Sequence, residues 1–135
     1  MSSKVQQFRD FMTLSDIKLE ERETEEATYF SLKSSPQGFG SFIVVAFFPR
    51  NEEIVSLFSL DYLSVARKRK DILEKLNVLN YKYTYCKFTL NEDLTIQVSV
   101  FLETKKTFCP ETILEMMVSV CKVLEDEYED LRAIL

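Results

Sequence analysis

Apolar residues recur with a helical period between residues 65 and 80, and the rest of the chain is arranged around this segment. The stripe has spacings of one, three and three residues: Ile72, Leu73, Leu76 and Leu79. This spacing predicts an amphipathic α-helix with one apolar face. Such a face has to be covered by neighbouring elements.

Two runs with a period of two follow this helix and predict an antiparallel hairpin. Residues 86–90 alternate between apolar and polar side chains, and residues 94–103 do the same. Asn91, Glu92 and Asp93 between them tolerate the backbone geometry of a turn. The helix is therefore expected to pack on the apolar face of the hairpin.

The first half of the chain alternates between short apolar patterns and breaker residues. The predicted elements are, in order, a helix at residues 3–13, a charged edge strand at 17–23, strands at 28–33 and 40–48 around a breaker-rich loop at 34–40, and a strand at 54–63. In the last of these runs, one side is expected to carry Ile54, Phe58, Leu60 and Tyr62.

All seven residues from 42 to 48 are apolar, so both faces of this strand need cover. One layer of helices covers a single face. The second face, with Ile43, Val45 and Phe47, is a candidate interface. Four alternatives remain open for this second face. A second subunit, a ligand or a long loop could bury it, or the strand could be an ordinary central strand covered within the chain. A homodimer or a groove for an extended protein segment is expected here.

The C-terminal pattern predicts one long helix that begins at Cys109 and Pro110, because proline suits the first helical position. Its apolar face is expected to carry Ile113, Met117, Val120, Cys121, Leu124, Tyr128 and Leu131. One shared core is predicted from Ile72, Leu73, Leu76, Leu79, Val98, Val100, Met117, Val120, Cys121 and Leu124.

Together these elements predict an α+β fold. It has an antiparallel sheet with helices mainly on one face, in the order α-β-β-β(-β)-α-β-β-α. The length of 135 residues, 46% hydrophobic residues and few glycines fit one globular domain over residues 1–135.

Composition argues against most enzyme classes. The chain has no His, which removes the commonest general base and imidazole metal ligands. Two glycines are too few for a nucleotide-binding loop. The acidic clusters at residues 20–26 and 125–130 lack the calcium-loop pattern and are expected to be solvated faces. No catalytic, cofactor-binding or metal-binding residue is assigned, and no cofactor is expected.

Charge and hydropathy limit the expected partners. A net charge of −5 disfavours nucleic acid, and the longest apolar run of seven residues is too short to span a membrane. The first ten residues lack the apolar core of a signal peptide, so a cytoplasmic location is expected. The expected partner is another protein or a second copy of the chain.

Four consecutive cations are the most unusual charged feature: Arg67, Lys68, Arg69 and Lys70. They are expected in the first turns of the helix, where they oppose its dipole, and are a candidate site for an acidic partner.

Cysteine usage leaves one chemical alternative. Three cysteines without close pairing indicate a reducing compartment. Cys86 and Cys121 fall in apolar registers and are expected in the core. Cys109 lies at a helix start near Lys106, where its pKa would be lowered, so a thiol-dependent redox sensor or enzyme is the alternative function.

The order of the elements resembles a known family. A helix ends at Leu79 and Asn80, the hairpin reads Phe-Thr-Leu-Asn-Glu-Asp-Leu at residues 88–94, and the last helix closes on Asp-Glu-Tyr-Glu-Asp-Leu at residues 126–131. This arrangement resembles the YbjN family of small bacterial proteins and the type III secretion chaperone fold. Cys86 stands where that family usually has Gly or Ala. The resemblance implies a non-enzymatic, chaperone-like or regulatory protein, often dimeric, that binds protein segments.

Overall fold

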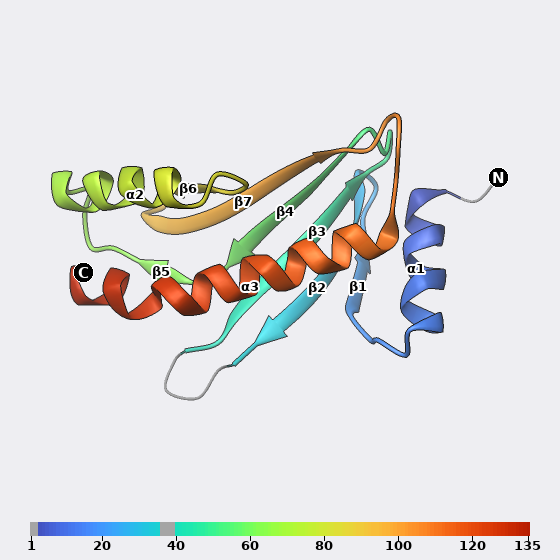
Figure 1. Ribbon diagram of the computed structural model, residues 1–135, viewed down its shortest axis with the longest axis horizontal. Helices are drawn as coiled ribbons and strands as arrows, with labels where there is room; N and C mark the ends of the chain where they lie inside the picture. The colour runs from blue at the N-terminus through green and yellow to red at the C-terminus, as the bar shows by residue number, and fades with distance from the viewer. Residues whose placement is uncertain (1–2, 36–39) are drawn as a thin grey trace.

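The computed structural model describes residues 3–35 and 40–135, which form a seven-stranded antiparallel sheet and three helices (Figure 1). The elements are α1 (Lys4–Leu14), β1 (Glu20–Glu23), β2 (Ala27–Ser34), β3 (Phe42–Pro49), β4 (Ile54–Leu60), β5 (Leu63–Ser64), α2 (Lys70–Lys82), β6 (Lys87–Leu90), β7 (Thr95–Glu103) and α3 (Pro110–Ala133). The sheet order is β1-β2-β3-β4-β7-β5, and β6 also pairs with β7. The predicted α+β fold class and element order are confirmed.

One face of the sheet forms the core. Cross-strand pairs place Phe30 beside Ala46, Ala46 beside Leu57 and Leu57 beside Val100, and all four side chains are buried. The long helix α3 crosses this face, and α1 lies beside it at the β1–β2 end (Figure 1). Phe8 of α1 is fully buried against the β1–β2 end of the sheet, with its ring centroid 4.8 Å from that of Phe30.

Helix α2 packs against β6 and begins five residues later than predicted. Its first residue is Lys70, and Arg69 is the N-cap, so three of the four cations precede the helix instead of filling its first turns. Ile72, Leu76 and Leu79 are buried as predicted. Leu73 was wrongly assigned to the core: it is 38% exposed, because it lies about 100° around the helix from Ile72.

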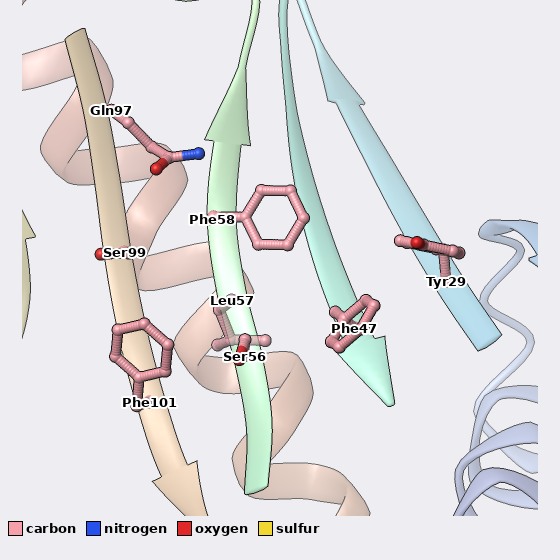
Figure 2. A pocket seen from close by; sticks show the side chains of 8 residues that line it. All are labelled: Tyr29, Phe47, Ser56, Leu57, Phe58, Gln97, Ser99 and Phe101. Atoms are coloured by element: carbon pink, nitrogen blue, oxygen red, sulfur yellow. The ribbon is translucent and has the colours of Figure 1, made fainter. Parts of the chain in front are cut away.

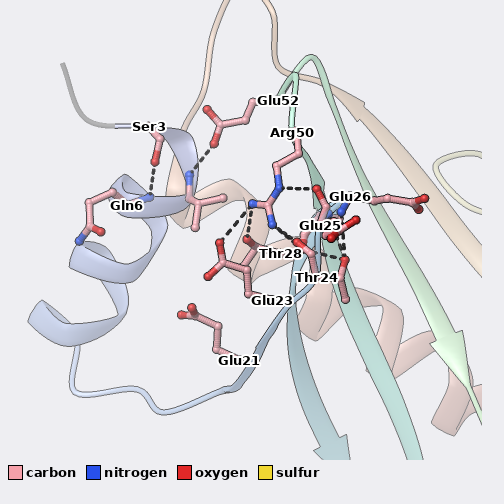
Figure 3. Close-up of polar contacts among 12 residues, drawn as sticks. Ser3, Gln6, Glu21, Glu23, Thr24, Glu25, Glu26, Thr28, Arg50 and Glu52 are labelled. Atoms are coloured by element: carbon pink, nitrogen blue, oxygen red, sulfur yellow. Dashed lines mark hydrogen bonds and ion pairs between the residues drawn. The ribbon is translucent and has the colours of Figure 1, made fainter.

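Two turns are fastened together at one end of the sheet (Figure 3). The Glu52 carboxylate accepts hydrogen bonds from the backbone N–H groups of Lys4 (3.0 Å) and Val5 (2.9 Å), which caps α1 from the β3–β4 turn. The Arg50 guanidinium donates to backbone carbonyls of the β1–β2 turn, including that of Glu25 at 3.1 Å, and pairs with Glu23 at 3.4 Å. These contacts fix α1 and β1 to the rest of the sheet.

Several predicted boundaries move for backbone reasons. The edge strand begins at Glu20 instead of residue 17. β4 ends at Leu60, because Asp61 takes a positive φ of 58° and turns Tyr62 into the core, where its hydroxyl donates to the Leu124 carbonyl at 2.5 Å. Leu94 (φ 67°) belongs to the hairpin turn. The predicted loop at residues 34–40 lies partly outside the described residues, since 36–39 are not described.

The predicted start of the last helix is confirmed, with Cys109 as the N-cap and Pro110 as the first residue of α3. None of the helices in the described parts of the chain is both long and apolar enough to cross a membrane.

Candidate functional site: the open face of the sheet

The sheet has a second face that carries no helix. Side chains alternate along a strand, so Ile43, Val45 and Phe47 project away from the core-facing residues of β3. Val45 is only 3% exposed, because its cross-strand neighbours Ser31 and Phe58 flank it on the same face. Ile43 and Phe47 are half-buried. Intramolecular cover of this face therefore comes from neighbouring strands, and no described helix contributes.

This face is hollowed in two adjoining places. The first hollow, of about 330 Å³, lies over β3, β4 and β7, and Figure 2 shows the side chains around it. The second, of about 430 Å³, lies toward β1 and β2. Tyr29 and Phe58 line both hollows. We call the two hollows together the open-face groove.

Aromatic rings dominate the open-face groove, and small polar side chains separate them. The Tyr29 and Phe47 rings meet edge to face at a centroid distance of 5.1 Å. On the β7 side Phe101 is 64% exposed. Ser56 and Ser99 leave room between the rings. A contiguous apolar surface of this kind is typical of a site that binds another molecule.

Large apolar residues at the rim extend the same surface. Ile54 and Leu60 of β4 alternate with the core-facing residues of that strand and are both exposed. Of the residues predicted to share one side of the 54–63 run, Ile54, Phe58 and Leu60 lie on the open face, and Tyr62 does not. The core side of β4 carries Val55, Leu57 and Ser59.

The basic run lies apart from the groove. Arg67 and Lys68 are exposed in the segment before α2. Arg69 is held by Asp71 (2.7 Å) and by the backbone carbonyl of Ile134 near the C-terminus. Lys70 pairs loosely with Glu74 at 3.8 Å. The structure therefore does not bring the two predicted partner-binding sets together.

The three cysteine thiols differ in burial and in the direction of their pKa shifts. Cys86 and Cys121 are buried, as predicted, and burial raises the pKa of each to about 11. Cys109 is exposed, and the hydroxyl and backbone N–H of Thr112, which favour the thiolate, lower its pKa. Within residues 3–35 and 40–135, no group of three or more Cys, Asp or Glu side chains could hold a metal ion.

Sequence reasoning missed one polar cluster, because Glu127 stands in an acidic run that was expected to be solvated. Its side chain is 2% exposed and accepts hydrogen bonds from Lys82 Nζ (2.8 Å) and Tyr83 Oη (2.5 Å). The cluster joins the end of α2 to α3. The helical period was the available signal: Glu127 lies three residues after Leu124 and four before Leu131, which places it on the buried face of α3.

Comparison with known proteins agrees with this architecture. A family model described as T3SS (YopN, CesT) and YbjN peptide-binding chaperone 1 matches residues 35–135, well over half of the chain. No curated protein matches, and no solved structure matches. The matched region contains β3, β4 and β7, which carry most of the open-face groove. The chain belongs to this peptide-binding chaperone family, TY-Chap1.

Proposed function

We propose that the chain is a non-enzymatic chaperone that holds an extended segment of a protein partner in the open-face groove. The observation that carries this proposal is a helix-free sheet face with exposed and half-buried aromatic rings around two hollows. Hollows of this size accept a few side chains of an extended segment, whereas a folded domain requires a broad interface. Membership of a peptide-binding family supports the same reading.

Filling the groove tests the proposal. Ser56 lies on the open face between Phe47 and Phe101, so Ser56→Phe places a ring in the hollow without entering the core. Ser64→Phe is the matched control, since Ser64 is exposed on β5 and lines neither part of the groove. Binding of labelled protein to an array of extended synthetic peptides should fall for Ser56→Phe and persist for Ser64→Phe. Equal binding by the two variants would place the peptide site elsewhere.

A homodimer through the same face is our second proposal, and the exposure of Phe101, Ile54 and Leu60 supports it. Two copies related by a twofold axis would each present this surface to the other. Light scattering should then show a dimer that Phe47→Glu converts to a monomer. A wild-type monomer at all accessible concentrations would contradict the dimer, and a dimer that survives Phe47→Glu would place the interface on another surface.

The remaining features give secondary proposals. We propose that residues 1–135 form a single domain, that the protein acts in the cytoplasm, and that Arg67 and Lys68 offer a free cationic site to an acidic partner. A single unfolding transition by circular dichroism would support one domain.

The alternative function, a thiol-dependent redox sensor or enzyme, rests on the exposure and lowered pKa of Cys109.

A further inference from the structure

One row of residues crosses the open face at right angles to the strands. Successive cross-strand pairs join Arg22 to Tyr29, Tyr29 to Phe47, Phe47 to Ser56, and Ser56 to Phe101. All five side chains line the open-face groove. The row therefore has a cation at the β1 end, two aromatic rings, a small residue that leaves a notch, and an exposed aromatic ring at the β7 end.

Arg22 is the one charged residue among the described residues that line the groove. Its side chain is exposed, and no ion pair to it is found in the described parts of the chain. Glu20 projects to the same face of β1 but does not line the groove. Arg50, by contrast, is already engaged by Glu23 and the β1–β2 turn. Arg22 is thus a cation available to a ligand.

We infer that the groove selects an extended apolar segment with a carboxylate at one end, which pairs with Arg22. This inference rests on the proposed function and adds the chemistry of the segment. An apolar side chain of the segment would fill the notch above Ser56, between Phe47 and Phe101. Arg22 and Tyr29 precede the residues that match the family model, so this selectivity belongs to the N-terminal part of the present chain.

The row also sets the length of the segment. From β7 to β1 there are four strand spacings of about 4.8 Å, which gives about 19 Å. An extended chain advances about 3.3 Å per residue, so about six residues span the row. The carboxylate should therefore lie about six residues from the side chain that contacts Phe101.

Peptide binding measured by fluorescence anisotropy tests the inference. The probe is a capped, labelled peptide of seven residues that alternates Val and Thr, with Phe at one end and Asp at the other. It is made in both chain directions, and each has a partner peptide with Lys in place of Asp. The wild-type protein should bind the Asp peptide at least about fivefold more tightly than the Lys peptide, and high salt should reduce the preference.

Charge reversal supplies the decisive comparison. Arg22→Glu should invert the preference, whereas Lys18→Glu should leave it unchanged, because Lys18 lines a different hollow on the α1 side of β1. Equal binding of Asp and Lys peptides by both the wild type and Arg22→Glu, with binding still blocked by Ser56→Phe, would overturn the inference and leave the proposed function standing. Binding that Ser56→Phe does not reduce would overturn both.

Discussion

Replacing Glu127 by Gln should lower the free energy of unfolding by about 1 to 2 kcal/mol at pH 7. The Glu127 carboxylate is almost fully buried and accepts from Tyr83 Oη at 2.5 Å and from Lys82 Nζ at 2.8 Å. A hydrogen bond to a charged group is worth about 1.5 to 3 kcal/mol and a neutral one about 0.5 to 1.5 kcal/mol. Gln keeps a neutral acceptor, so the expected loss is about 1 kcal/mol for the hydrogen bond from Tyr83 and less than that for the hydrogen bond from Lys82, whose side chain is largely exposed.

Glu127→Ala should cost more, about 2 to 4 kcal/mol, because the carboxylate oxygen that accepts both hydrogen bonds disappears and a small cavity remains. The side chain of Lys82 is 59% exposed, so water can solvate its ammonium group once its partner is removed. This exposure keeps the loss below the cost of breaking a fully buried ion pair.

The pH dependence of this effect has a definite sign. Burial would raise the pKa of Glu127, but the hydrogen bonds from Lys82 and Tyr83 outweigh it and hold the pKa below its ordinary value. A carboxyl with a lowered folded-state pKa stabilises the fold above its unfolded pKa of about 4.3, and this contribution is lost as pH falls through the folded-state value. The difference between wild type and Glu127→Gln should therefore shrink below about pH 4.

Urea unfolding followed by circular dichroism measures both effects. Glu129→Gln is the matched control, since Glu129 is an exposed carboxylate on the same helix and should change stability by less than about 0.5 kcal/mol. Equal unfolding midpoints for Glu127→Gln and Glu129→Gln at pH 7 would show that the buried carboxylate of Glu127 does not stabilise the fold. A difference that grows on acidification would refute the assigned protonation state.

Three further predictions concern other parts of the molecule. Glu52→Ala should cost about 1 to 2 kcal/mol by uncapping α1, while Glu53→Ala, whose side chain is exposed beside it, should be near neutral in the same urea titration. Leu76→Ala should cost about 2 to 5 kcal/mol and Leu73→Ala much less, in line with their burial; equal losses would contradict the observed face of α2. Alkylation at neutral pH, read by mass spectrometry, should modify Cys109 well before the other two thiols, and equal rates for all three would remove the redox alternative.

Local sequence patterns predicted the elements that have a strong hydrophobic period or clear helix-start and turn residues. The start of α3 follows from proline after Cys109, and the β6–β7 hairpin follows from two alternating runs around a polar turn. The seven apolar residues at 42–48 correctly indicated a strand with two apolar faces. In each case the signal lies within a few residues of the feature, where backbone geometry and side-chain period act directly.

Features that depend on distant pairing could not be read in the same way. The row from Arg22 to Phe101 exists because four strand registers align, and no local pattern encodes a register between strands far apart in the chain. Glu127 looked like its acidic neighbours, since its burial depends on where the end of α2 packs. α2 was predicted to begin too early, because residues 65–69 fit a helical pattern yet lead out of β5 as a connection.

The most direct test of the proposed peptide-binding site is a ¹⁵N NMR titration of the wild-type protein with the seven-residue Asp-bearing peptide. If the open-face groove binds the peptide, the largest chemical-shift changes should fall on the backbone amides of the open-face row, at Tyr29, Phe47, Ser56 and Phe101, and Ser56→Phe should abolish them. Saturable changes confined to the exposed side of α2, around Tyr81, would contradict binding in the groove and place the binding surface on that helix.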